Sequence, residues 1–144
     1  ADPAKRVTIA GTYNAHPLTV AATKATLLKL RDPEADVYGK LYSLGARMEE
    51  GLTEIFRRRN YPTTIVRQGS AFALYFMDHV PENWADIARN NDAARDVAYR
   101  KALIEKGVFQ FPVTTKQGSI SYAHTEADID RTLEITEEVL NELG

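Results

Sequence analysis

The segment GTYNAHPLTVAATKATLLKL, residues 11–30, places a glycine and a threonine in a polar loop directly ahead of a helical pattern. Glycine lets the backbone approach a ligand closely, and a neighbouring threonine hydroxyl can donate a hydrogen bond to a phosphate oxygen. The first amide groups of a helix have no partner within the helix, so this end favours anions. Gly11 and Thr12 are therefore candidate anion-binding residues. An ordinary capped loop would have the same composition, and these residues alone leave both interpretations open.

The remaining polar residues form no recognisable catalytic or metal-binding pattern. The three histidines, His16, His79 and His124, are too far apart in sequence for a metal-ligand spacing. His124 directly precedes Thr125 at an expected helix start, where a local hydrogen bond is the expected role. The sequence contains neither a nucleotide-binding glycine loop nor a Gly-x-Ser-x-Gly elbow. We expect no metal site, and the residues by themselves indicate no reaction.

Two helices are expected after the opening loop. Apolar residues recur at helical spacing over 17–30, and Pro17 suits the first helical position, where its missing N–H is not needed. A longer apolar stripe runs from Val37 to Phe56 and predicts a second helix. This helix is expected to reach the arginine run 57–59, whose positive charges favour a helix C-terminus, and to end at Asn60-Tyr61-Pro62. The run is therefore interpreted as a solvated helix end and not as a phosphate-binding patch.

A strand pair is expected next. Phe72, Leu74 and Phe76 alternate with smaller or more polar residues, as in a strand with one buried face. Gly69 and Ser70 divide this run from the preceding one and indicate a hairpin or a bulged strand. The segment 78–90 contains proline, asparagine and several charges, and we interpret it as a polar connection.

The last third of the chain predicts a helix, two short strands and a final helix. Residues 92–106 show helical spacing, with Gly107 as a C-terminal cap. The runs VFQF and SISYA, at 108–111 and 119–123, are expected to be strands. Thr125 and Asp128 form a capping pattern that starts the final helix. The order of elements predicts an α+β fold, with helices on one face of a small antiparallel sheet of three to four strands.

Composition limits the class of protein. A chain of 144 residues is the usual size for one domain. Its formal charge of −2 does not indicate a basic surface that would bind nucleic acid or an anionic membrane. The absence of cysteine excludes disulfides and thiolate chemistry. No apolar run is long enough to span a bilayer. These features predict a soluble, cytoplasmic protein, and the first residue, alanine in place of methionine, favours a piece of a longer one.

Four segments together resemble a known family. These are GTYNAHPLTVAATKATLLKL, GSAFALYF, RKALIEKGVFQFP and SISYAHTEADIDRTLEITEEVL, and they cover nearly the whole chain. In this order they are similar to the C-terminal third of class III, pyridoxal-phosphate-dependent aminotransferases. The nearest resemblance is to the glutamate-1-semialdehyde 2,1-aminomutases.

The resemblance implies a fold-type I enzyme and a role for the opening loop. In this scheme residues 1–16 are a loop that follows an absent large domain, 17–30 is an interdomain linker helix, and 31–144 is the small C-terminal domain. The enzyme would be a homodimer that binds pyridoxal 5'-phosphate and acts on an amino acid or related amine. Thr12 would reach across the dimer to the cofactor phosphate, with Gly11 shaping the turn.

The resemblance also implies what is absent. The lysine that binds the cofactor covalently lies upstream of the Gly-Thr loop in this family, in a Gly-Lys-x-x-Gly-Gly-Gly context that none of the lysines present here shares. We therefore expect no catalytic residue in this chain and no transaminase activity from it alone. The alternative is a stand-alone binding or dimerisation module derived from the same domain.

Two positions depart from the aminomutase pattern. Where those enzymes usually read Gly-Asn-Pro, this chain has Ala-His-Pro, and His16 is expected to be a capping or packing variant. Where they carry a glutamate that faces the active site, this chain has Lys116. An ammonium in place of a carboxylate inverts the local charge and changes which substrates are tolerated. Lys116 is thus a candidate substrate-binding residue for an acidic group, and a solvent-facing lysine at a loop tip is the competing interpretation.

Overall fold

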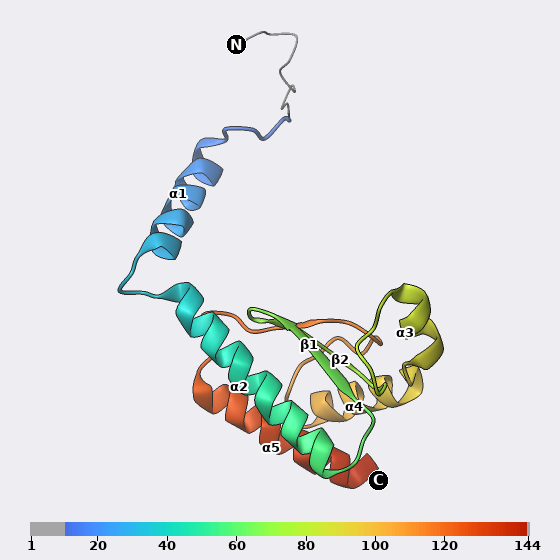
Figure 1. Ribbon diagram of the computed structural model, residues 1–144. Helices are drawn as coiled ribbons and strands as arrows, with labels where there is room; N and C mark the ends of the chain where they lie inside the picture. The colour runs from blue at the N-terminus through green and yellow to red at the C-terminus, as the bar shows by residue number, and fades with distance from the viewer. Residues whose placement is uncertain (1–10, 144) are drawn as a thin grey trace. The chain divides into compact units, whose positions relative to one another are not determined.

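A computed structural model describes residues 11–143 of the chain. These divide into two compact units, which meet in sequence between Val37 and Tyr38. Figure 1 shows both units and labels their helices and the strands β1 and β2. Part of the expected 1–16 loop, residues 1–10, lies outside the described range.

The first unit consists of a turn and one helix. Asn14 N–H donates to the Gly11 carbonyl over 3.0 Å, and this turn leads into α1, Pro17–Arg31. Pro17 stands at the first helical position, as its sequence context predicted. No residue of α1 is buried, and the Leu18 side chain is 74% exposed. The helix is therefore held by its own backbone bonds and not by a core within its unit.

The second unit contains a three-stranded antiparallel sheet in the order β1-β2-β3. β1, Thr64–Gln68, and β2, Ala71–Tyr75, form the predicted hairpin, in which Val66 pairs with Ala73. β3 is only Gly118–Ser119, and it pairs with the start of β2. The sequence predicted three to four strands, and the sheet has three.

Helices α2, α4 and α5 supply the other side of the core. They span Val37–Arg58, Ala93–Glu105 and Glu126–Leu143, and α2 and α5 run side by side (Figure 1). Phe56 of α2 and Tyr99 of α4 both pack edge-on against Phe76, with centroids 5.8 Å from it. Phe72 and Leu74 of β2 point into the same cluster. The predicted α+β fold with helices on one face of the sheet is confirmed.

Two glycines permit a close approach between α2 and the hairpin. Gly69 has a φ of +61°, which glycine adopts at little steric cost, and it turns the chain from β1 to β2. A Cβ atom added to Gly45 in α2 would lie 2.2 Å from the Gly69 carbonyl oxygen. The helix can therefore contact the hairpin turn only because this position has no side chain.

Three local expectations differ from the structure. The segment 78–90 is not wholly a connection, because Asn83 accepts a hydrogen bond from Asp86 N–H and starts the short helix α3, Trp84–Asn90. The run 108–111 is not a strand, since its backbone is held by other groups: Val108 N–H donates to the Leu103 carbonyl, and the Phe111 carbonyl accepts from Arg100. Of the run 119–123, only Ser119 is in a strand.

Candidate functional site

The loop that carries Lys116 is anchored by an ion pair inside the protein. Asp96 and Arg100 lie one turn apart on α4, and their side chains are 0% and 2% exposed. Arg100 Nε donates to Asp96 Oδ1 over 2.5 Å. A buried charge without a partner destabilises the folded state, so removal of either side chain would leave the other as an unpaired charge inside the protein.

Both residues of the pair also bind the loop backbone. Asp96 Oδ2 accepts hydrogen bonds from Thr114 Oγ1 at 2.8 Å and from Thr115 N–H at 2.7 Å. Arg100 Nη1 donates to the Phe111 carbonyl at 3.4 Å. Thr115 has a φ of +62°, a conformation that β-branched residues rarely adopt. These bonds hold the loop in a conformation that its sequence alone would disfavour.

Lys116 is the first residue after this anchored turn. Its side chain is exposed, and its Nζ atom lies 5.5 Å from the centre of the Phe111 ring. With 109–111 and 117–119 it lines a hollow of about 340 Å³, which we call the loop groove. The position is compatible with binding a ligand, and the assignment of Lys116 to substrate binding stays a prediction.

Gly11 and Thr12 lie in the first unit, in the turn ahead of α1. Both residues are exposed, and within residues 11–143 the Thr12 hydroxyl has no hydrogen-bond partner. A Cβ atom on Gly11 would lie 3.0 Å from the Asn14 side-chain oxygen. The turn thus presents a donor to its surroundings, as an anion contact would need, and the predicted roles of Gly11 and Thr12 are not tested by this geometry.

His16 occupies its expected position at the start of α1. It is the N-cap residue of α1, but only its carbonyl takes part, by accepting from Val20 N–H at 2.9 Å. Its side chain makes no capping hydrogen bond and is exposed, so the expected capping or packing role is not seen in the described unit. The ring lines an apolar hollow of about 420 Å³ along α1.

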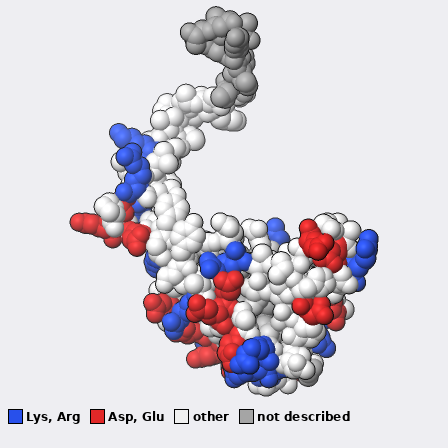
Figure 2. Space-filling view, in the orientation of Figure 1, with Lys and Arg blue, Asp and Glu red and all other residues white. Residues whose placement is uncertain are grey.

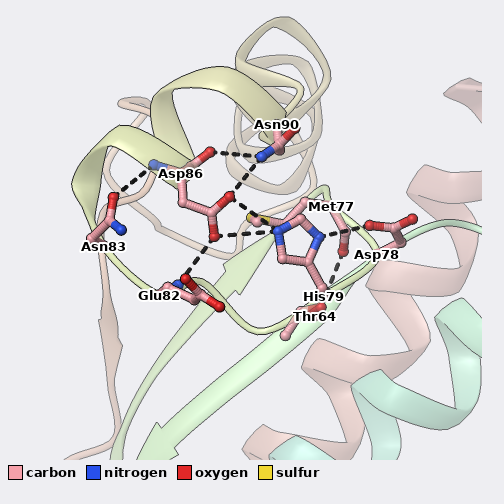
Figure 3. A network of polar contacts seen from close by, with 8 residues as sticks. All are labelled: Thr64, Met77, Asp78, His79, Glu82, Asn83, Asp86 and Asn90. Carbon is pink, nitrogen blue, oxygen red and sulfur yellow. Dashed lines mark hydrogen bonds and ion pairs between the residues drawn. The ribbon is translucent and has the colours of Figure 1, made fainter.

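The other two histidines make local contacts. His124 Nδ1 accepts from Ser121 N–H at 3.0 Å, which is the local bond expected beside the helix start. His79 lies between two carboxylates, with Nδ1 2.8 Å from Asp78 and Nε2 3.1 Å from Asp86 (Figure 3). Hydrogen bonds, first with Asp78 and then with Asp86, raise the pKa of His79 above its ordinary value.

Charges on the second unit are largely paired. Arg57 and Arg58 of the basic run contact Glu54 and Glu137, and Arg59 donates to Asn141. Acidic and basic side chains are interspersed on the face shown in Figure 2. In the described part of the chain, no group of three or more histidine or acidic side chains could hold a metal ion. Every helix described there is too short or too polar to cross a bilayer.

The sequence alone did not identify Asp96, Arg100 or the aromatic pair beside Lys116. The only available signal was the spacing of four between an acidic and a basic residue, which is common on solvated helix faces. Phe109 and Phe111 were assigned to a strand that does not form. Their exposure, 71% and 54%, distinguishes them from the core aromatics.

Comparison with known proteins finds relatives of this chain among the glutamate-1-semialdehyde 2,1-aminomutases. It is 36% identical over 135 residues to glutamate-1-semialdehyde 2,1-aminomutase from Thermomicrobium roseum, a match that covers 94% of this chain and 31% of that protein. The aminomutase of Pseudomonas aeruginosa, solved in complex with PMP, has the same fold over 100% of this chain and 32% of its own, with a TM-score of 0.83 and 21% identity.

An ω-transaminase from Sphaerobacter thermophilus gives a TM-score of 0.75 at 24% identity, over 98% of this chain and 32% of its own. Family models gave no match. The chain spans about a third of the length of the proteins that it resembles. In sequence and in fold, this chain belongs with the C-terminal domain of the class III, pyridoxal-phosphate-dependent aminotransferases, and its sequence is similar to that of the glutamate-1-semialdehyde 2,1-aminomutases.

Proposed function

We propose that this chain is the small domain of a longer, pyridoxal-phosphate-dependent aminotransferase or aminomutase. In this role it would help to move an amino group on an amino acid or a related amine. The observation that carries the proposal is the match along 94% of the chain to an aminomutase about three times as long. We assign residues 17–30 to the interdomain helix and 31–144 to the small domain.

The residues of the opening turn fit the cofactor phosphate. Thr12 is exposed, has a hydroxyl without a partner in the described residues, and is followed by the start of a helix, which favours an anion. The cofactor, when bound, supplies the electron sink and carries the amino group. Thr12 would donate a hydrogen bond to its phosphate from the partner subunit of a homodimer, with Gly11 allowing close approach of the backbone.

Lys116 would bind the acidic group of the substrate. An exposed ammonium on an anchored loop can attract a carboxylate and disfavour a cationic side chain. The aminomutases carry a glutamate at the equivalent position, so this chain would belong to an enzyme with a different preference. Replacing Lys116 by glutamate in the longer enzyme should shift kcat/KM from acidic toward neutral amino donors. An unchanged preference would exclude Lys116 from the substrate site.

Activity requires residues that this chain does not contain. The lysine that would bind the cofactor belongs to the large domain, so the 144-residue chain should neither bind the cofactor covalently nor transfer an amino group. The longer protein should do both. Visible absorbance of the bound cofactor and an amino-transfer assay on the two proteins provide the test. Turnover by the 144-residue chain alone would refute the assignment.

The phosphate contact has its own test. Thr12→Ala in the longer enzyme should weaken cofactor binding by about tenfold, the effect expected for a hydrogen bond to a charged group. Thr23→Ala is the matched control, because Thr23 is also exposed in the first unit and donates only to the Thr19 carbonyl. Equal cofactor affinity in the two variants would remove Thr12 from the cofactor site.

A further inference from the structure

The loop groove presents two aromatic rings that the core does not use. Phe109 and Phe111 are 71% and 54% exposed, and their ring centres lie 5.5 Å apart at an angle of 65°. This edge-to-face pair forms an apolar wall on one side of a hollow of about 340 Å³. A volume of this size falls in the range of small-molecule sites. Burial of the two rings under an apolar ligand would be favourable.

The same groove contains a cation without a counterion. No carboxylate of the described residues lies within ion-pair distance of Lys116, whose nearest recorded partner is the Phe111 ring. Lys106, by contrast, contacts Glu142 at 2.8 Å. The ammonium of Lys116 can therefore pair with an incoming anion without first losing an acidic neighbour, which makes an anionic ligand the electrostatic match.

The groove is formed before any ligand arrives. Phe111 is fixed through its carbonyl by Arg100, and Thr115, next to Lys116, is fixed through its N–H by Asp96. Since the pair that holds them is buried, the backbone that carries Phe111 and Lys116 is held in one arrangement. Binding then orders side chains and little of the backbone, which lowers its entropic cost.

From this combination we propose that the loop groove binds arylalkyl carboxylates. The aromatic ring packs on Phe109 and Phe111, and the carboxylate pairs with Lys116. The inference rests on the proposed function, because it names the class of substrate, an amino acid with an aromatic or bulky apolar part and a carboxylate, for the same Lys116 site.

The test uses the 144-residue chain and requires neither cofactor nor turnover, so its failure is distinct from failure of the proposed function. Saturation-transfer NMR with 3-phenylpropanoate should show binding to the chain in the millimolar range, as expected for a small ligand in a shallow site. Propanoate lacks the ring and 3-phenylpropan-1-amine replaces the carboxylate by an ammonium. Propanoate should bind at least about fivefold more weakly because it buries no ring. The amine should bind about two- to fivefold more weakly, the range expected for loss of an exposed ion pair.

Charge variants assign the binding to the groove. Lys116→Glu should abolish detectable binding of 3-phenylpropanoate, and Lys116→Arg should retain it. Lys101→Glu, an equal charge change at another exposed lysine of the second unit, should have little effect. Circular dichroism would verify that each variant is folded. Equal binding of all three probes, or binding that Lys116→Glu leaves unchanged, would overturn the proposal.

Discussion

Asp96 and Arg100 form an ion pair that is buried on α4 and joined to the backbone of the loop before Lys116. Arg100 Nε lies 2.5 Å from Asp96 Oδ1, and Asp96 Oδ2 accepts the N–H of Thr115. The same two residues therefore contribute to the stability of the fold and to the shape of the loop groove. A change at either residue should have both consequences.

Asp96→Ala should lower the free energy of unfolding by about 3–5 kcal/mol, because Arg100 would remain buried without its partner. Urea unfolding of the 144-residue chain measures this. Glu105→Ala, on an exposed position of the same helix, is the control and should change stability by less than about 0.5 kcal/mol. If the two variants unfold at the same urea concentration, the pair does not have the structural role assigned to it.

The hairpin and the long helix were predictable because their patterns are local. Phe72, Leu74 and Phe76 alternate, and the apolar stripe after Val37 has helical spacing. Helix α3 was missed because its seven residues contain no buried side chain, and it depends on one cap, Asn83. The run 108–111 has strand-like composition, but it forms no strand. Arg100 of α4 donates a hydrogen bond to the Phe111 carbonyl, and the sequence pattern of the run does not indicate this contact.

The candidate site was predictable only in part. The residue types ahead of the helix indicated an anion contact at Thr12, and the resemblance added its cofactor role and the candidate Lys116. The surroundings of both residues could not be read from the sequence. The anchoring role of Asp96 depends on burial, and an acidic residue four positions before an arginine is usually solvated. The pair is buried by tertiary contacts, which the hydrophobic periodicity of the sequence does not indicate.

Gly45→Ala tests the close approach of α2 to the hairpin. Alanine is the better helix former by about 1 kcal/mol, yet its Cβ would lie 2.2 Å from the Gly69 carbonyl oxygen. Backbone must move to relieve this contact, so we expect a net loss of about 1–3 kcal/mol in urea unfolding. Gly51→Ala is the matched control on the same helix, because its Cβ would meet only the Leu133 side chain, which can rotate. A Gly45→Ala protein more stable than Gly51→Ala would contradict the contact.

His79 should make the region around α3 sensitive to pH. The pKa of His79 is raised in the folded protein, so its stabilising contacts are complete below its ordinary value of 6.5. They are lost as the pH rises through the higher folded value. NMR titration of the ring protons should give that raised pKa. The protection of the α3 amides from exchange, measured relative to their intrinsic exchange rate at each pH, should fall over the same pH range.

Asp78→Asn is the informative variant for this pH effect. The hydrogen bond with Asp78 is the largest cause of the raised pKa, and the Asp78 side chain is itself 81% exposed. The variant should move the pKa of His79 back toward 6.5 without unfolding the chain. An unaltered titration would show that the contact in Figure 3 does not control His79.

Thr125 caps α5 and controls the titration of Asp128. Thr125 Oγ1 donates to Asp128 Oδ2 at 2.7 Å, and this bond is the first cause of the lowered pKa of Asp128. A lowered pKa means that the contact stabilises the protein above the ordinary value of 3.8 and is lost as the pH falls through the folded value.

Thr125→Ala should therefore cost about 1 kcal/mol near neutral pH, the usual loss for an N-cap, and should raise the pKa of Asp128. Thr53→Ala is the control, because Thr53 donates only to a carbonyl within α2 and caps no helix. Urea unfolding at neutral and acid pH measures the stability, and carboxyl NMR shifts report the pKa. Since the capping contact weakens once Asp128 is protonated, the difference between Thr125→Ala and the unmodified chain should shrink in acid. A difference that stays constant down to low pH would mean that the carboxylate contributes nothing to the cap.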